Sequence, residues 1–432
     1  MAKFTDSQWT KVNTLLDANE RRFGLPERRA DSVVLASFNI RKLGQISNKS
    51  AGAWDFLRRF CRQCDLIAIQ EVQDDLEGLN HLKDLLGSKY GMVASDITGG
   101  IAGKRGMVER LAYLFQWERV ERTEVASDIT IDRSAVLDTL YEQRADFLAA
   151  FKARVDALKK WRTKVNVKLA PWVAAVAEWE AGGRTGKKPG KPGTPKKPPF
   201  VLPHFLTFMR TPHCVAFRVK GGAGADPYQF LAVNAHLLYG DKSKQRKERE
   251  MEFKGLIRWL VERARQAGRM YHKDMILLGD LNLDFRKVDA RKVRIENDIK
   301  ALNGGELKGK GRAAVYFPFL DVHPSRKDIQ PKAQAIFRST ARRTETYDQI
   351  AIFRHDKRLP RAADKSKAGT EAGGFDYGVF NFSDLFAEAL HGKPLLKLTK
   401  PQRKALLKKF EHDVSDHMPI WIRLPKPGLP KP

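Results

Sequence analysis

From residue 32 onward the chain alternates short apolar runs with amphipathic stretches. Apolar runs of strand length that are rich in β-branched residues predict buried strands, and apolar residues at three- and four-residue spacing predict helices. The pattern therefore predicts strands layered with helices. The expected strands are VVLASFNI, LIAIQEV, RLAYLFQW, CVAFRV, QFLAVNAHL, DMILLGD, YDQIAIF and MPIWIRL, and helices are expected through WDFLRRFCRQC, LEGLNHLKDLLGS and RKEREMEFKGLIRWLVERARQ.

The strand pattern is interrupted once, by a long region whose apolar residues have helical spacing. We expect one long helix there, ended or kinked by Pro171, then a short helix through WVAAVAEWE that folds back. The following GGRTGKKPGKPGTPKKPP has the composition of a mobile linker. Because strands lie on both sides, we interpret the region as an insertion into one domain. The expected organisation is a helical lead-in at 1–30, a domain formed by 31–124 and 201–424, the insertion at 125–200, and a tail at 425–432.

Charge adds a class of partner to this picture. Lys and Arg number 79 against 51 Asp and Glu, which gives a formal net charge of +28. Such a field attracts polyanions, either nucleic acid or an acidic membrane surface. Basic residues cluster in YGDKSKQRKER and along the insertion, where they contact nucleic-acid phosphates or form a solvated helix face.

Location and cysteine chemistry follow from simpler features. No apolar stretch approaches the roughly 20 residues that cross a bilayer, and MAKFTDSQWTKV lacks the hydrophobic segment of a secretion signal, so we expect a cytoplasmic protein without a membrane span. Cys61, Cys64 and Cys214 are too few for a disulfide framework. The CRQC pair is a metal or redox pair, or two small buried thiols; we favour the thiols because no second Cys/His pair accompanies it.

Polar residues end or open most of the predicted strands. Any one of them has an ordinary interpretation, because Asn, Asp and Gly often form turns. Glu71 and Asp348 differ, since each lies among apolar neighbours, where an unpaired charge costs several kcal/mol. Ends of some strands and starts of others share one edge when neighbours run antiparallel, so we expect a single site. Its members are Asn39, Glu71, Glu109, His236, Asp280, Asn282, Asp348, Asp416 and His417.

These residue types suit phosphate chemistry. Magnesium takes oxygen ligands from one or two carboxylates and keeps waters for a phosphate substrate, which Glu71 and Asp416, helped by Asn39, satisfy. Two histidines paired with carboxylates can share proton transfer. His417 with Asp348, and His236 with Glu109, form the expected pairs.

The ordered motifs FNIRKLG, IQEVQD, the ER of VERLAYLF, RTP, NAHL, GDLNLD, YDQI and SDHMPI resemble the endonuclease/exonuclease/phosphatase superfamily, most closely its deoxyribonuclease I branch. The resemblance implies an α/β, or α+β, fold: a four-layer α/β/β/α sandwich of two mixed sheets, with the helical insertion added. It also implies metal-dependent phosphoester hydrolysis. By position, Asn39, Glu71 and Asp416 match the metal site, and the two His–carboxylate pairs match proton-transfer groups, with base and acid left open. Asp280 and Asn282 match residues around the reacting phosphate, with Arg210 and Arg41 as phosphate contacts.

Two departures qualify the resemblance. The nuclease branch has a tyrosine two residues before the position of Glu109, where this chain has Met107, and the disulfides of its secreted relatives have no counterpart here. YDQI resembles the nuclease form of its motif. We therefore hypothesise a cytoplasmic DNA endonuclease that depends on Mg²⁺, or on Mn²⁺ in its place, and leaves 5′-phosphate and 3′-hydroxyl ends. The alternatives are a phosphatase or lipid phosphodiesterase of the same superfamily, and a non-catalytic nucleic-acid-binding protein. The insertion is either a DNA-gripping arm or, through residues 130–180, a surface for a protein partner or for self-association.

Overall fold

A computed structural model gives the fold of the chain, and it describes residues 2–98, 108–130, 133–198, 200, 203, 207–222, 224–240, 243–266, 268, 270–283, 314–321, 338–360 and 377–428. Met107 lies outside the described residues. The chain forms two compact units. The first contains Met1–Thr130, Phe208–Asp241 and Glu252–Pro432, and the second contains Ile131–Thr207 and Lys242–Met251.

The first unit is built on two six-stranded sheets. The order in the first sheet is β11 (Tyr377–Val379), β12 (Ile420–Pro425), β1 (Ser32–Leu43), β2 (Leu66–Gln73), β4 (Glu109–Gln116) and β3 (Tyr90–Ala94). The order in the second is β5 (Val120–Asp128), β6 (His213–Val219), β7 (Tyr228–His236), β8 (Met275–Asp280), β10 (Asp348–Arg354) and β9 (Ala314–Tyr316). Both sheets are mixed, as the resemblance implied.

The two sheets follow one plan. Each has a central parallel pair, β1 with β2 or β7 with β8, and antiparallel neighbours on both sides. The carboxyl ends of the parallel strands therefore meet the amino ends of β4, β10 and β12 at one edge. This arrangement brings polar groups from distant parts of the sequence to the same edge, among them His236, Asp280 and Asp348.

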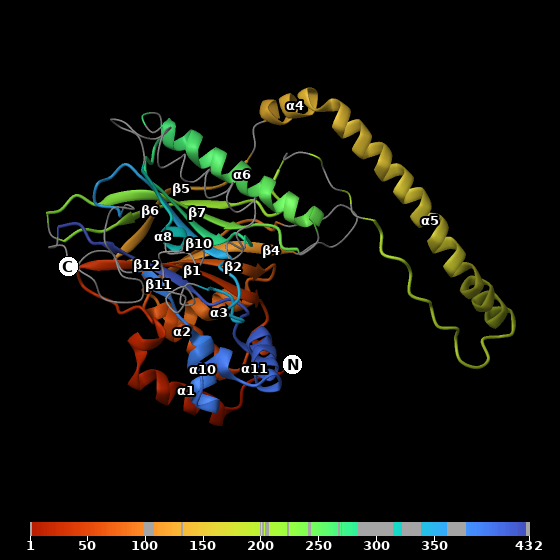
Figure 1. Cartoon of the computed structure of the whole chain (residues 1–432), viewed down its shortest axis with the longest axis horizontal. Coiled ribbons are helices and arrows are strands. Elements are labelled where there is room, and N and C mark those ends of the chain that lie inside the picture. Colours follow the sequence, from red (N-terminus) through yellow and green to blue (C-terminus); the bar gives the residue numbers. More distant parts are fainter. Residues whose placement is uncertain are drawn as a thin grey trace. The chain divides into compact units, whose positions relative to one another are not determined.

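Helices cover the outer faces of both sheets (Figure 1). On the outer face of the first sheet lie α1 (Asp6–Ala18), α2 (Ala51–Arg62), α3 (Glu77–Leu86), α10 (Phe382–His391) and α11 (Lys400–Asp413). On the second sheet lies α6 (Ser243–Arg265), and the short α8 (Pro318–Asp321) follows β9. Short 3-10 helices occupy Glu20–Phe23, Ile46–Asn48 and Leu395–Lys397. The expected four-layer sandwich is confirmed.

The interior between the sheets is aromatic, with a buried polar bridge near the site. Tyr113 and Phe115 of β4 pack on Phe217 of β6 with ring centroids 5.3 and 5.4 Å apart. Gln70 of β2 donates to Asn234 Oδ1 of β7 at 2.7 Å. Because a buried amide must find a partner, this bond fixes the two parallel pairs to each other.

The three cysteines are buried and unpaired, and burial raises the pKa of each thiol. They belong to the apolar interior of the first unit, which agrees with their interpretation as small buried thiols. Among the helices that the structure describes, none combines the length and the apolar character needed to cross a membrane.

The second unit differs from the expectation in its helices. It contains α4 (Arg133–Glu142) and α5 (Arg144–Ala181), and α5 includes Pro171 within its length. Of the two alternatives for Pro171, an end of the helix is wrong because α5 continues to Ala181, and so is the second helix that folds back. Proline costs roughly 3 kcal/mol inside a helix, and the alanine-rich turns after Pro171 favour continuation. Residues 125–128, placed in the insertion by the sequence, belong to β5 and pair with β6.

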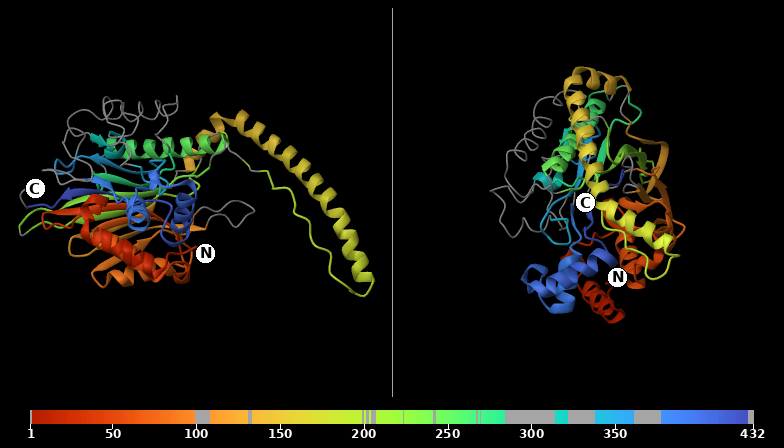
Figure 2. Two further views of the ribbon diagram at one scale, coloured as in Figure 1. Left: turned by 60° about the horizontal axis from the view of Figure 1, so that its bottom comes forward. Right: turned by 90° about the vertical axis from the view of Figure 1, so that its right-hand side faces the viewer.

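The lysine- and proline-rich segment after α5 runs back along that helix (Figures 1 and 2). Three tryptophans of α5 donate their indole N–H groups to carbonyl oxygens of this return segment, residues 184–198. Lysines of the segment lie over the same rings. The bonds join Trp161 to Pro195 at 2.8 Å, Trp172 to Pro189 at 3.1 Å and Trp179 to Gly186 at 3.3 Å, with Lys197, Lys191 and Lys188 respectively 6.0, 5.3 and 5.6 Å from the ring centroids. The expected mobile linker is thus bound to the helix before it.

Candidate active site

Asp280 is the centre of the candidate site because strand register places it between two other site residues, His236 and Asp348. It ends β8, and in the ladder it pairs with His236 of β7 on one side and Asp348 of β10 on the other. Gly279 precedes it with a φ of +156°, and a Cβ there would overlap the carbonyl oxygen of Ala235. The missing side chain therefore permits the close approach of β7 and β8.

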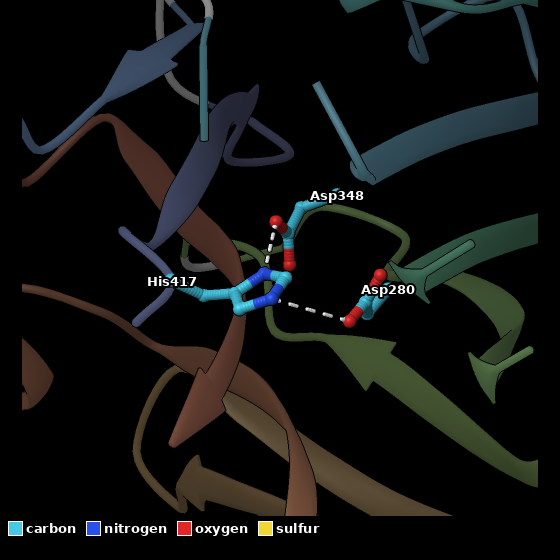
Figure 3. Close-up of side chains that lie close together, drawn as sticks. All are labelled: Asp280, Asp348 and His417. Carbon is cyan, nitrogen blue, oxygen red and sulfur yellow. Dashed lines mark hydrogen bonds and ion pairs between the residues drawn. The ribbon is translucent and has the colours of Figure 1, made fainter. Parts of the chain in front are cut away.

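His417 links two of these carboxylates (Figure 3). Its Nδ1 lies 2.8 Å from Asp348 Oδ2, and its Nε2 lies 3.6 Å from Asp280 Oδ2. Ser339 donates its hydroxyl to the same Asp348 oxygen at 2.6 Å. All of these side chains are at least nine-tenths buried. The imidazole is therefore fixed in orientation, with Nε2 directed at Asp280.

His236 approaches the same oxygen from another strand. Its Nε2 lies 3.6 Å from Asp280 Oδ2, and its Nδ1 lies 3.3 Å from Glu109 Oε2, an ion-pair distance at which no hydrogen bond is formed. Arg210 donates its Nε–H to Glu109 Oε2 at 2.7 Å and an Nη1–H to the carbonyl of Leu237. Asp280 Oδ2 is thus equidistant from two imidazoles, each with its own carboxylate.

Charge and burial shift the pKa values of these groups. Burial opposes ionisation of Asp280, but the two histidines outweigh it and lower the pKa of that carboxyl. Burial disfavours the imidazolium of His417, yet Asp348 and Asp280 raise its pKa well above the usual value. Burial raises the pKa of Asp348 even though His417 and Ser339 hydrogen bond to it. Burial likewise opposes ionisation of Glu109, whose pKa is lowered overall by His236 and Arg210. The surroundings therefore favour the ionised forms of Asp280 and Glu109 and the protonated forms of Asp348 and His417, which is the kind of divergence found among groups that exchange protons.

Oxygen ligands gather beside this cluster, around residues 39–42 of β1. Asn39 Nδ2 donates to Glu71 Oε1 at 3.1 Å and to Asp280 Oδ2 at 3.0 Å. Ser415 donates its hydroxyl to the Asn39 carbonyl at 2.7 Å, which ties Asp416 to the same stretch. Arg41 lies 3.4 Å from Asp416 Oδ2.

The backbone at Glu71 departs from a regular strand. Its φ is +61°, and the pairing of β2 with β4 shifts register between Ile69 and Val72. A β-bulge of this kind redirects a side chain, and a non-glycine residue at positive φ costs about 1 kcal/mol or more. Lys42 donates its backbone N–H to Glu71 Oε2 at 3.2 Å, which holds the redirected carboxylate.

The oxygen-bearing group of Glu71, Asn39 and Asp416 fits a hard divalent cation. Asn39 Oδ1 and Asp416 Oδ1 are buried acceptors without a hydrogen-bond partner among the described residues. Unpaired buried acceptors are rare unless a ligand satisfies them, and Mg²⁺ prefers carboxylate and carbonyl oxygens.

Asp280, Asp348 and His417 form a second group whose ligand atoms all lie within 4.8 Å of one another. That group contains a nitrogen, and His417 Nδ1 is already bonded to Asp348. Mg²⁺ therefore fits the first group better.

The remaining expected residues also reach this region. Asn282 has a φ of +51°; its backbone N–H donates to Asp280 Oδ1 at 2.9 Å and its Nδ2 donates to the Leu237 carbonyl at 3.0 Å. Arg210 is 2% exposed and is paired with Glu109, so a phosphate contact from it stays a prediction. Of the site residues expected from the sequence, all except Asn39 and Asp348 line one cavity of about 1230 Å³. Asn39 is hydrogen bonded to Glu71 and Asp348 to His417, and both of these partners line the cavity.

Sequence reasoning missed several residues of this region. Ser339 and Ser415 position site residues through their hydroxyls, but isolated serines give no sequence signal. Helix α11 forms part of the cavity wall, and a signal for it was present: Thr399 and Gln402 form a capping box, and Pro401 stands in the first turn. Both α10 and α11 follow the last predicted basic loop, and no helix was predicted from the sequence there.

Comparisons with known proteins return structural matches. No protein-family model and no curated protein matches the chain. An endonuclease/exonuclease/phosphatase family protein from Bacteroides thetaiotaomicron matches with 14% identity and a TM-score of 0.40, covering 91% of this chain and 94% of that one. A mannosyl-6-phosphatase from the same organism matches with 13% identity and 0.39, over 90% and 98%. Truncated TDP2 from Caenorhabditis elegans matches with 12% identity and 0.39, over 91% and 98%.

Proposed function

We propose that the chain is a divalent-metal-dependent phosphodiesterase that cuts DNA internally and leaves 5′-phosphate and 3′-hydroxyl ends. One observation carries the proposal: two imidazoles, each beside its own carboxylate, lie 3.6 Å from the same oxygen of Asp280. Hydrolysis of a phosphodiester needs one group to take a proton from water and another to give one to the leaving oxygen, and this pair supplies both.

The residues divide the work as follows. Asp348 holds His417 by a hydrogen bond at Nδ1, and Glu109 lies at ion-pair distance from Nδ1 of His236. Each Nε2 is thereby left on the Asp280 side, where the reacting phosphate would bind. Asp280, between the imidazoles, keeps them oriented and stabilises the protonated form of His417. A Mg²⁺ ion held by Glu71, Asp416 and Asn39, or Mn²⁺ in its place, would supply positive charge to the phosphate oxygens.

DNA is the proposed substrate because of charge. The net charge of +28 favours a polyanion, and Arg41 and Lys42 stand beside the metal-binding group. We place the enzyme in the cytoplasm with DNA as its partner, on the basic surface of the domain and on the insertion.

The test is hydrolysis of supercoiled plasmid with Mg²⁺, with and without chelator. We expect relaxed and linear products only with the metal, and ligation by DNA ligase should show 5′-phosphate and 3′-hydroxyl ends. Glu71→Gln should lower the rate by roughly 100-fold or more, since it removes a metal-bound charge. Glu118→Gln is the matched control, because Glu118 is exposed and forms a surface pair with Lys89.

The same variants locate the metal without reference to activity. Titration with Mn²⁺, followed by electron paramagnetic resonance, should show weaker binding for Glu71→Gln and nearly wild-type binding for Asp348→Asn. The reverse result would place the metal between Asp280, Asp348 and His417.

Two other outcomes would replace the proposal. An inert plasmid together with turnover of an inositol phosphate or a phospholipid would identify the phosphatase or lipid phosphodiesterase alternative. Plasmid binding without turnover of any phosphoester would identify a non-catalytic nucleic-acid-binding protein.

A further inference from the structure

One wall of the cavity is a basic helix that the proposed chemistry does not use. Lys400, Arg403, Lys404 and Lys408 of α11 all line the cavity. Their spacing of three, four and eight residues places them on one face of the helix. Among the described residues, no carboxylate forms an ion pair with any of the four, whereas Arg41 and Arg210 of the same cavity are paired with Glu411 and Glu109.

This placement is unfavourable for the helix itself. Positive charge is disfavoured near a helix N-terminus, and α11 has no acidic residue in its first turn while Lys400 and Arg403 stand there. Like charges four residues apart cost about 0.2–0.5 kcal/mol per pair. An ordinary solvated helix face would interleave acidic residues at such positions. An anionic ligand in the cavity removes both penalties.

The opposite face of α11 holds the helix rigidly. Phe410 is buried among Phe4, Phe382 and Phe386, with ring centroids 5.7, 5.2 and 5.2 Å away. Asp413 accepts hydrogen bonds from the backbone N–H groups of Phe4 at 2.9 Å and Ser50 at 2.7 Å.

The chain continues from this anchored end directly into the candidate site. Ser415, Asp416 and His417 follow Asp413 after one residue. The distance between the basic face and the site is therefore set by a short, fixed segment.

Two further cations extend the basic wall. Lys42 and Arg342 line the same cavity with exposed side chains. The cavity, at about 1230 Å³, is larger than the roughly 300–1,000 Å³ typical of small-ligand pockets. Lys400 and Lys408 are separated by about 12 Å along the helix axis at 1.5 Å per residue. That length corresponds to roughly three to four nucleotides at about 3.4 Å per nucleotide.

We propose that the basic face of α11, Lys400, Arg403, Lys404 and Lys408, binds the phosphates of a nucleic-acid strand next to the phosphate that is cut. The inference rests on the proposed function and specifies its substrate: a strand that continues for several nucleotides beyond the scissile bond. A phosphomonoester or a phospholipid headgroup has no such row of anions.

The test compares two variants with four substitutions each. The first changes Lys400, Arg403, Lys404 and Lys408 to Gln; the control changes Lys11, Arg62, Lys393 and Lys397, which are exposed and lie off the cavity, to Gln. Binding of a fluorescent strand of about 20 nucleotides is measured with chelator present over a salt series. We expect the first variant to bind roughly 10- to 100-fold more weakly and to lose about 3 units of salt slope, at about 0.7 per contact. The control should differ much less.

A kinetic readout separates this inference from the proposed function. The ratio of kcat/KM for the oligonucleotide to kcat/KM for bis(4-nitrophenyl) phosphate should fall at least about tenfold in the first variant, since the small diester has no flanking phosphates. Unchanged binding and an unchanged ratio in an enzyme that cuts DNA would overturn the inference alone. Lost binding in a protein that hydrolyses no phosphodiester would support the inference and overturn the proposed function. Inositol hexakisphosphate that binds to this face more tightly than the strand would overturn the assignment to nucleic acid.

Discussion

Lys49 is a buried cation that fixes the backbone just before the candidate site. Its ammonium donates to the carbonyl oxygen of Val414 at 2.7 Å, close to Asp416 and His417. Burial lowers the pKa of Lys49 to about 8, although Asp413, Asp416 and Glu71 favour the charged form. A single side chain thus joins the start of α2 to the segment that carries the last two site residues.

The lowered pKa of Lys49 predicts how stability depends on pH. The unfolded state binds this proton up to a pKa near 10.5, and the folded state releases it near 8, so the free energy of unfolding should rise with pH between those values. Between pH 7.5 and 10, Lys49 should contribute a rise of about 2 kcal/mol. Urea unfolding at both pH values measures it. Lys49→Met should lack this part of the rise and Lys11→Met should retain it; equal pH dependence in all three proteins would contradict the assignment.

For the individual site residues, the sequence shows which residue types are present and in what order, but not the backbone conformation that each one adopts. The need of Glu71 and Asp348 for partners was predictable, because an unpaired charge among apolar residues is costly; Asp348 is buried and Glu71 is half-buried. The positive φ of Glu71 and Asn282 was not, since neither residue type signals it. The bulge in β2 is a feature of its pairing with β4, a strand distant in the sequence. The pattern of residues within β2 alone therefore could not predict it.

At the scale of elements, the close contact of β7 and β8 sets the distance between His236 and Asp280. The two strands are parallel, and the carbonyl of Ala235 occupies the space next to Gly279. No other residue type leaves that space free. The geometry of the imidazole therefore depends on a glycine that takes no part in the chemistry.

Gly279→Ala should separate the ends of β7 and β8 and displace His236 from Asp280. We expect a loss of activity of about 100-fold, since a misplacement near 1 Å has that effect, together with a lower melting temperature. Gly268→Ala is the control, because a Cβ there meets nothing within 4 Å. Wild-type rates of plasmid cutting in Gly279→Ala would show that strand spacing does not set the geometry of the site.

Elements with strong local patterns were predictable from the sequence, and weak ones were not. Each of the eight strands expected from apolar runs is present. The strands β3, β5, β9 and β11 are missing from that set. Strand β5 alternates with exposed polar residues, and the other three are short, with five residues in β3 and three each in β9 and β11. The uninterrupted α5 was missed because proline was weighted above the alanine-rich turns that follow it.

At the scale of the whole molecule, the insertion interrupts one hairpin without interrupting the fold. Strands β5 and β6 flank it and pair from Asp128 with His213 onward, and Ile129 donates its N–H to the carbonyl of Pro212 at 2.9 Å. The two ends of the insertion are therefore already joined by the sheet. A short loop can replace residues 131–207, since none of the site residues lies there.

Replacing residues 131–207 by a short Gly/Ser loop should leave folding intact and weaken DNA binding. Lysines of the return segment contact phosphates under the DNA-arm hypothesis, so the salt dependence of duplex affinity should become flatter. A salt series of binding measurements decides. An unchanged slope with a lower mass in solution would instead identify a self-association surface, for which the exposed Leu148, Phe151 and Val155 at helical spacing are suited.

The order of the strands has a consequence for synthesis of the protein. Strand β1 is made before every other described strand, but one of its two neighbours, β12, is made after all of them and closely follows Asp416 and His417 in the sequence. Likewise, the backbone N–H of Phe4 cannot form its hydrogen bond to Asp413 until that residue has been made. A nascent chain therefore lacks Asp416 and His417 until all the other described strands have been made, so no shorter product of translation can assemble the candidate site.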